Sequence, residues 1–172
     1  MVGIKFVGSG GQGVILAGLI LGKAAAVYDK KEAVFTESYG AETRGGFSSS
    51  SVIISDEKID YPYVIEPDIL VAFSQQGYNS VSNTLKDIGV LIYESDLVQP
   101  KSTKNMFGIP ATRLAKEKFN KTTSINMIFL GFLVSKTGVV SIDSLIKAVE
   151  ESVPKGTEKE NVEAVKLGFN YS

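Results

Sequence analysis

Short apolar runs alternate with polar, glycine-rich segments along the first part of the chain. The run Gly3–Val7 (GIKFV) is mostly apolar and is followed by glycines, which predicts a central strand. Residues 14–28 (VILAGLILGKAAAVY) are apolar on almost every side, a pattern typical of a helix that is buried on most of its faces. Glu32–Glu37 (EAVFTE) predicts a second strand, so we expect the chain to begin with a βαβ unit.

The next segment predicts a long strand, Gly46–Ser55 (GFSSSSVIIS), in which alternate residues counted from Phe47 and from Ser48 lie on opposite faces. Asp56–Lys58 predicts a turn into a further strand at Ile59–Tyr61, and the two strands would form a hairpin. The serine run has neither a G-x-S-x-G setting nor a histidine base, so we do not expect a serine nucleophile.

The rest of the chain predicts further strands and then helices. Asp68–Phe73 and Gly89–Glu94 are the clearest buried strands, with a helical stretch near Tyr78–Lys86 between them and a short strand at Asn105–Ile109. Helices are expected over Ala111–Phe119, over Ser124–Lys136, from Ser141 as an N-cap through Glu150, and over Lys159–Leu167 with Gly168 as the stop. Because no repeat or linker is evident, we expect residues 1–172 to form one three-layer α/β/α domain with a mixed, mostly parallel sheet.

Composition removes several classes of function. The net charge is −1 and the basic residues are scattered, which argues against a nucleic-acid surface. The chain has no cysteine, which excludes disulfides, thiolate catalysis and iron–sulfur ligation, and no histidine, the usual general base near neutral pH. The most apolar stretch, Val14–Val27, is interrupted by Lys23 and is too short to cross a bilayer. We expect no signal peptide, no membrane partner and a cytoplasmic protein.

Residues 8–13 (GSGGQG) form a glycine-rich turn between a predicted strand and a predicted helix. The spacing satisfies G-x-G-x-x-G, and such glycines let backbone N–H groups approach a phosphate at the helix N-terminus. Glu37, near the end of the second strand, would then be the ribose-binding acid of a nicotinamide site. The pattern also fits two other interpretations: a tight turn that only packs the helix on the sheet, which the pattern alone favours, and a subunit contact.

Residues 38–46 (SYGAETRGG) are the second candidate segment. Arg44 carries a planar, permanently charged guanidinium suited to a carboxylate or phosphate, and the glycines after it leave room beside it. An ion pair of Arg44 with Glu42 or Glu37 would instead fix the loop. Tyr39 would either contact a ligand or be a half-buried residue that packs against the rest of the protein. The candidate binding residues are therefore Gly8, Ser9, Gly10, Gly11, Gln12, Gly13, Ser38, Tyr39, Arg44, Gly45 and Gly46.

Other polar residues at element ends are interpreted as structural. Asn126 opens the apolar run MIFLGFLV, where a helix cap or a satisfied buried amide is favoured over a ligand contact. Asp68, Glu94 and Asp96 lie at strand ends, but they have no partners at metal-ligand or acid–base spacing. No catalytic residue and no metal site is therefore assigned to this chain.

Four blocks of the sequence together resemble a known family. GSGGQGVILAGLILGKAA, SYGAETRGGFSSSSVIISDEKIDYP, PDILVAFSQQ and NMIFLGFLVSKTG are similar, in this order and spacing, to the gamma subunit of 2-oxoacid:ferredoxin (acceptor) oxidoreductases, over about residues 3–170. The SYG-x-E-x-RGG form looks closest to the gamma chain of 2-oxoglutarate synthase. Pyruvate and branched-chain 2-oxoacid enzymes are the alternatives.

The resemblance implies that the enzyme forms an acyl-CoA by oxidative decarboxylation and reduces ferredoxin. It places thiamine diphosphate, magnesium and iron–sulfur clusters on alpha, beta and ferredoxin-like delta partner subunits. This chain has no cysteines for clusters and no GDG…N-type thiamine diphosphate motif, which agrees with that division.

The resemblance also implies that the gamma subunit contributes to a coenzyme A site at a subunit interface. We expect residues 8–13 and 38–46 to face that interface, with the helix N-terminus and Arg44 attracting phosphates and with Gln12 and Tyr39 adding hydrogen bonds or stacking. An assembly surface without coenzyme A contact and a stand-alone nucleotide-binding domain are the alternatives. No catalysis by the isolated chain is expected.

Overall fold

The structure is a computed structural model that describes residues 1–40, 46–101 and 105–172. Its elements begin with strand β1 (Val2–Ser9), helix α1 (Val14–Lys23), the π-helical turn η1 (Ala24–Tyr28), and strands β2 (Glu32–Tyr39), β3 (Phe47–Ser55) and β4 (Ile69–Ala72). Helix α2 (Gln75–Val81), the 3₁₀ turn η2 (Ser82–Thr84), strand β5 (Val90–Glu94) and strand β6 (Met106–Ile109) follow. The chain ends in helices α3 (Ala111–Phe119), α4 (Ile125–Thr137), α5 (Ile142–Ser152) and α6 (Glu158–Phe169).

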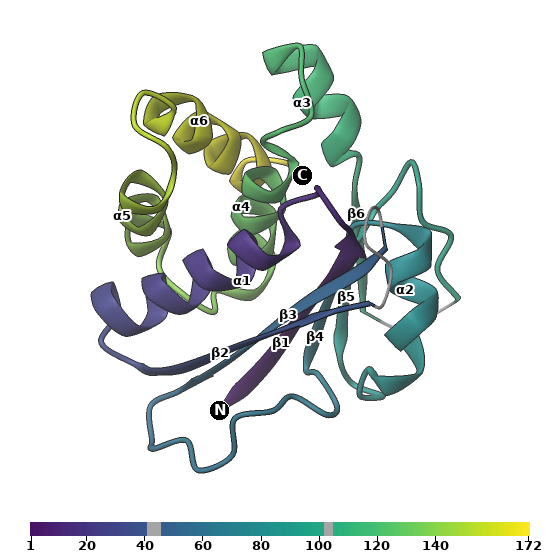
Figure 1. The fold of residues 1–172 in the computed structure, drawn as a ribbon, viewed down its shortest axis with the longest axis vertical. Coiled ribbons are helices and arrows are strands. Elements are labelled where there is room, and N and C mark those ends of the chain that lie inside the picture. The colour runs from purple at the N-terminus through teal and green to yellow at the C-terminus, as the bar shows by residue number, and fades with distance from the viewer. Residues whose placement is uncertain (41–45, 102–104) are drawn as a thin grey trace.

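The strands form one mixed sheet of six, in the order β2-β3-β1-β4-β5-β6 (Figure 1). Strand β3 runs antiparallel to both of its neighbours, β1 and β2. The pairs β1–β4, β4–β5 and β5–β6 are parallel. The predicted mixed, mostly parallel sheet is confirmed. Strand β2 runs in the same direction as β1, but β3 lies between them, so the predicted βαβ unit spans an inserted strand.

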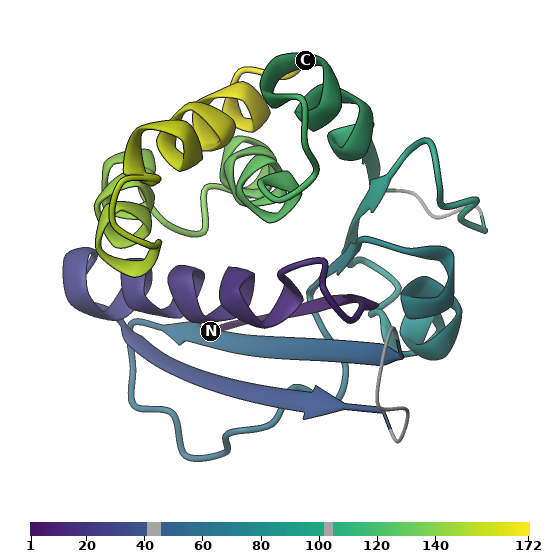
Figure 2. The same ribbon diagram turned by 45° about the horizontal axis from the view of Figure 1, so that its top comes forward.

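Helices cover the two faces of the sheet unequally. Figure 2 shows α1 and the C-terminal helices α4, α5 and α6 stacked on one side of β2 and β3. Ile4 and Phe6 of β1 point into the large core on that side, whereas Val7 belongs to a smaller core with Tyr78 and Val81 of α2 on the other side. The three predicted layers are present, with α2 and its flanking loops as the thin third layer.

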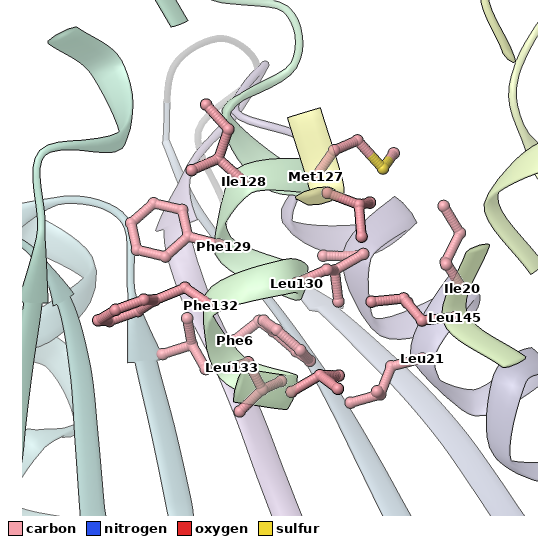
Figure 3. Close-up of a cluster of buried hydrophobic side chains, with 14 of the residues drawn as sticks. Phe6, Ile20, Leu21, Met127, Ile128, Phe129, Leu130, Phe132, Leu133 and Leu145 are labelled. Atoms are coloured by element: carbon pink, nitrogen blue, oxygen red, sulfur yellow. The ribbon is translucent and has the colours of Figure 1, made fainter. Parts of the chain in front are cut away.

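Helix α4 is buried along nearly its whole length, because the sheet and α1 lie on one side of it and α6 on the other. Every residue from 125 to 134 is buried. Figure 3 shows its side chains meeting Phe6 of β1, Ile20 and Leu21 of α1 and Leu145 of α5. This position explains why the sequence of α4 has no polar face.

Two sequence predictions, the end of the last helix and a strand at Ile59–Tyr61, are wrong, because in both cases residues distant in the sequence determine the local structure. Gly168 does not end the last helix but lies inside α6, where an added Cβ would overlap the Ile128 carbonyl of α4. Ile59–Tyr61 forms no strand, because both edges of β3 are already paired and Pro62 lacks the N–H that a ladder needs. The predicted N-cap of α5 is confirmed, since the Ser141 hydroxyl accepts a hydrogen bond from the Ser144 N–H.

Candidate functional site

The two candidate segments lie side by side at one end of the sheet. The pairing of β1 with β3 ends at Ser9 opposite Phe47, and the Gly10 N–H then donates to the Gly46 carbonyl over 2.9 Å. On the other side of β3, the Gly40 N–H donates to the Phe47 carbonyl over 2.7 Å. The turn after β1 and the two ends of the segment at 38–46 are therefore neighbours in space.

The side chain of Gln12 holds the glycine-rich turn in place. The Gln12 Oε1 accepts a hydrogen bond from the Ser9 N–H over 2.7 Å, and the Gln12 Nε2 donates to the Phe73 carbonyl over 3.4 Å. An added Cβ on Gly8 would lie 2.6 Å from the Gln12 Oε1, so the turn closes only around a glycine there. Gln12, which the sequence suggested as a ligand contact, is used inside the turn.

Gly13 is the N-cap residue of helix α1 and has φ 76° in the left-handed region. Within the described residues, no side chain caps this end and no acidic residue occupies the first turn. An uncapped N-terminus carries unpaired N–H groups and a partial positive charge, which together favour an anion. Gly11, with φ 88°, is exposed in front of it, and an added Cβ on Gly11 would have no neighbour within 4 Å.

Asn126 of α4 fixes the start of this helix. It is buried, its Nδ2 donates to the Gly13 carbonyl over 3.3 Å, and its Oδ1 accepts from the Met127 N–H over 3.0 Å. The interpretation of Asn126 as a satisfied buried amide is confirmed. Its connection to Gly13, across more than a hundred residues of sequence, is a positioning contact that sequence reasoning missed.

Ser38 and Tyr39 do not point to the same place, because successive side chains of a strand alternate. Phe35 of β2 packs in the large core under α1, so Tyr39 lies on the α1 side and Ser38 on the opposite side. Tyr39 is 64% exposed. Partial burial, together with the charge and hydrogen bond of Glu37, raises the pKa of the Tyr39 phenol. Arg44 and Gly45 lie outside the described residues.

The sheet order argues against a dinucleotide site. In that site the acid that binds the ribose lies at the end of the strand next to the glycine turn. Here Glu37 is on β2, and the antiparallel strand β3 separates β2 from β1. Two strand spacings place β2 about 10 Å from β1. The G-x-G-x-x-G spacing is therefore present, but the ribose-binding acid that a dinucleotide site also requires is not beside it.

A topological switch point lies beside the glycine turn. The adjacent parallel strands β1 and β4 continue into α1 and α2, which pack on opposite faces of the sheet. Ligands of open α/β sheets bind at such points, beyond the carboxyl ends of the strands. The Ser9 and Ser74 hydroxyls meet there at 3.4 Å. Sequence reasoning did not single out Ser74; the signal was its place directly after the buried strand that ends in Phe73.

The carboxylates at strand ends are structural, as the sequence indicated. Buried Glu94 accepts hydrogen bonds from the Thr112 N–H (2.8 Å) and Oγ1 (2.9 Å) at the start of α3. Burial raises the pKa of Glu94, and these hydrogen bonds oppose the shift. Asp68 accepts from the Gly3 N–H, and Asp96 pairs with Arg113 over 3.0 Å.

The part of the chain that the structure describes holds neither a metal-binding group of side chains nor a membrane-spanning helix. No group of three or more acidic, cysteine or histidine side chains is placed to hold a metal ion there. No helix in the same ranges has the length and apolar character needed to cross a membrane.

Comparison with known proteins decides the family. Residues 3–171 match the family described as pyruvate ferredoxin/flavodoxin oxidoreductase. The chain belongs to this family. It is 50% identical to the 2-oxoglutarate synthase subunit KorC of Methanocaldococcus jannaschii, over 98% of this chain and 92% of that protein. The predicted resemblance to gamma subunits of 2-oxoacid:ferredoxin oxidoreductases is confirmed, and the chain is a subunit of an enzyme of this class.

Two solved oxidoreductase structures share the fold. The keto/oxoacid ferredoxin oxidoreductase gamma subunit from Geobacter sulfurreducens superposes with a TM-score of 0.87 and 39% identity, covering 98% of this chain and 96% of that one. The 2-oxoglutarate:ferredoxin oxidoreductase from Magnetococcus marinus, which holds 2-oxoglutarate, coenzyme A and succinyl-CoA, gives a TM-score of 0.86 at 24% identity. That superposition covers 97% of this chain and 30% of the other. The oxidoreductase fold therefore also occurs as part of a longer chain.

Proposed function

We propose that this chain is the gamma subunit of a cytoplasmic complex that converts 2-oxoglutarate and coenzyme A to succinyl-CoA and CO₂. The two electrons released by the decarboxylation pass to ferredoxin. The proposal is supported by the 50% identity to a 2-oxoglutarate synthase subunit and by the SYGAETRGG segment, which resembles the 2-oxoglutarate type. Pyruvate and branched-chain 2-oxoacids are the alternative substrates.

Other subunits are proposed to carry the chemistry. This chain has no cysteine to hold clusters and no GDG…N-type thiamine diphosphate and magnesium motif, so the iron–sulfur clusters, thiamine diphosphate and magnesium are assigned to the alpha, beta and delta partners. Thiamine diphosphate supplies the carbanion chemistry of the decarboxylation when it is bound to those partners. The contribution of this chain is to bind and orient coenzyme A at the interface and to support assembly.

The observation that carries this role is the hydrogen bond from Gly10 to Gly46, which brings the two candidate segments together at the uncapped start of α1. Coenzyme A carries a pyrophosphate and a 3′-phosphate, and both fit backbone N–H groups and the guanidinium of Arg44. Gln12 acts indirectly by holding the turn closed, whereas Tyr39 is exposed and available for stacking.

The first experiment is an anaerobic pull-down of the tagged chain from its native cell extract. We expect it to recover a thiamine diphosphate-binding subunit and an iron–sulfur subunit, and the recovered complex to use 2-oxoglutarate in preference to pyruvate. If the recovered complex prefers pyruvate, the proposed substrate is wrong, but the proposed role as a gamma subunit still stands. Recovery of the chain alone would contradict the proposed assembly.

The coenzyme A role is tested separately with Arg44→Ala in the purified complex. We expect the KM for coenzyme A to rise about tenfold or more, the loss that one charge-assisted phosphate contact implies, while the KM for 2-oxoglutarate stays unchanged. Arg113→Ala is the matched control, because Arg113 pairs with Asp96 and is remote from the turn in sequence. Loss of assembly without a change in the coenzyme A KM would favour a pure assembly surface.

A further inference from the structure

A polar groove lies on the side of the sheet that faces away from α1. Its volume is about 310 Å³, and its lining residues come from the neighbouring strands β1, β2 and β3 and from the segment after β3. Lys5, Ser51 and Thr36 form one row across these strands, because Lys5 is opposite Ser51 and Ser51 is opposite Thr36. In Figure 2 the irregular segment that follows β3 lies on this side of β2 and β3.

The Lys5 ammonium has no ion-pair partner among the described residues. Glu37 also lines this groove, but its side chain alternates to the α1 side of the sheet with Phe35 and hydrogen-bonds Tyr39. Burial lowers the pKa of Lys5, and no neighbouring charge or hydrogen bond contributes to the shift. A half-buried ammonium without an anion is costly to maintain for stability alone. Its position at the middle of the central strand therefore indicates a ligand.

Two serine hydroxyls beside Lys5 are also unpaired. Ser49 is 4% exposed and Ser51 is 8% exposed, and neither hydroxyl makes a hydrogen bond within the part of the chain that the structure describes. By contrast, the hydroxyl of Ser50, which faces the α1 side of the sheet, is paired: its Oγ donates to the Val14 carbonyl over 2.7 Å. The groove thus combines a cation with hydroxyl donors, which together match the oxygens of a carboxylate.

The segment after β3 has exposed aromatic and apolar residues, and its residues Tyr63 and Val64 line the groove. Tyr61, Tyr63 and Ile65 in the segment after β3 are 57%, 60% and 66% exposed. The rings of Tyr61 and Tyr63 meet edge to face with centroids 5.6 Å apart. Exposed tyrosines around a buried polar centre are typical of protein–protein interfaces, where aromatic residues surround a desolvated anchor.

We propose that this face binds another subunit of the complex and that an aspartate or glutamate side chain of that subunit inserts into the groove onto Lys5. The inference rests on the proposed assembly, and it names a surface distinct from the turn after β1. Charge complementarity selects an acidic anchor, and exposed Tyr63, with Tyr61 packed against it, lies beside the anchor. Ser49, Ser51 and Thr36 would donate hydrogen bonds to the inserted carboxylate.

The test measures binding of the full-length chain to the immobilised, separately purified thiamine diphosphate-binding subunits. Lys5→Met keeps the apolar stem and removes the charge, and we expect the dissociation constant to rise about thirtyfold or more. Lys5→Arg retains the charge and should recover most of the affinity. Lys155→Met, at an exposed position between α5 and α6, is the matched control and should bind like the unmodified chain.

A stability measurement separates an interface role from a folding role. Because the ammonium is partly buried without an anion, Lys5→Met should unfold at the same or a higher temperature than the unmodified chain. Weaker assembly together with unchanged or higher stability supports the inference. A lower melting temperature would instead assign Lys5 to the fold and overturn it.

Zero-length carbodiimide coupling of the assembled complex provides a second readout, because it joins an amine and a carboxylate that are in contact. We expect a cross-linked peptide that contains Lys5 and an acidic residue of the other subunit. A link from Lys5 to Glu37 of the same chain, or unchanged binding by Lys5→Met, would overturn the inference. If the unmodified chain itself fails to bind the other subunits, the proposed function fails instead.

Discussion

Gly11 and Gly13 provide a matched pair of substitutions in the turn after β1. Both residues have positive φ angles, 88° and 76°, so alanine at either position costs the left-handed backbone energy of about 1–2 kcal/mol. Their surroundings differ. An added Cβ on Gly11 meets nothing within 4 Å, whereas on Gly13 it would lie 2.7 Å from the Asn126 Cγ. Gly13→Ala therefore also has to displace a buried side chain.

The expected losses follow from these two contributions. Gly11→Ala should lower the free energy of unfolding by about 1–2 kcal/mol. Gly13→Ala should lower it by about 2–5 kcal/mol, because overpacking a buried site adds about 1–3 kcal/mol. For a chain of this length, each kcal/mol corresponds to about 2–4 °C in melting temperature. Urea unfolding of the isolated chain measures both variants.

A double-mutant cycle with Asn126→Ala tests the steric part directly. Asn126→Ala leaves no backbone group unpaired, since the Gly13 carbonyl still accepts from the Ala17 N–H and the Met127 N–H still reaches the Ser124 carbonyl. In that background we expect Gly13→Ala to cost about 1–3 kcal/mol less than in the unmodified chain. Equal losses for Gly11→Ala and Gly13→Ala, or additive behaviour of the cycle, would refute the reasoning.

Three further predictions concern buried positions. Burial raises the pKa of Glu94, so the native state binds its proton more tightly than the unfolded state does, and stability should fall as pH rises through the raised pKa. Glu94→Gln should remove this dependence in urea unfolding between pH 4 and 8, and parallel curves for the two proteins would contradict the assignment. Gly131→Ala should lower stability by about 3 kcal/mol or more, because its Cβ would overlap the Val165 carbonyl of α6. Gly22→Ala, whose Cβ would make an ordinary 3.7 Å contact, should be neutral or gain about 0.5–1 kcal/mol in thermal unfolding.

Local sequence signals predicted a helix or strand correctly where its formation depends mainly on its own residues. The hydroxyl of Ser141 caps α5 as predicted, because a cap needs only the N–H groups of the next turn. The apolar run Asp68–Phe73 contains β4, since a strand buried on both faces needs apolar residues at every position. The alternation of β3 is also confirmed, with Val52 in the large core and Ser51 in the groove on the other side.

The candidate site was predicted only in part. The sequence identified the glycine turn, and the neighbouring position of Gly46 is confirmed by the hydrogen bond from Gly10. The sequence did not indicate that Gln12 closes the turn, that Asn126 holds its far end, or that Ser74 lies beside it. Each of these contacts joins segments whose distance in space depends on how the strands are ordered.

The sequence by itself determined the βα turn, the apolar runs that become strands and helices, and the absence of the side chains that would hold clusters or act as a histidine base. Only the tertiary structure decided that β3 inserts between β1 and β2, which moves Glu37 away from the turn and leaves β3 without a free edge for a hairpin. It also decided that Lys5 lies beside serine hydroxyls and makes no ion pair with any residue that the structure describes. The physical reason is that periodicity and capping are properties of neighbouring residues, whereas strand order and the partners of a buried charge depend on packing across the whole chain.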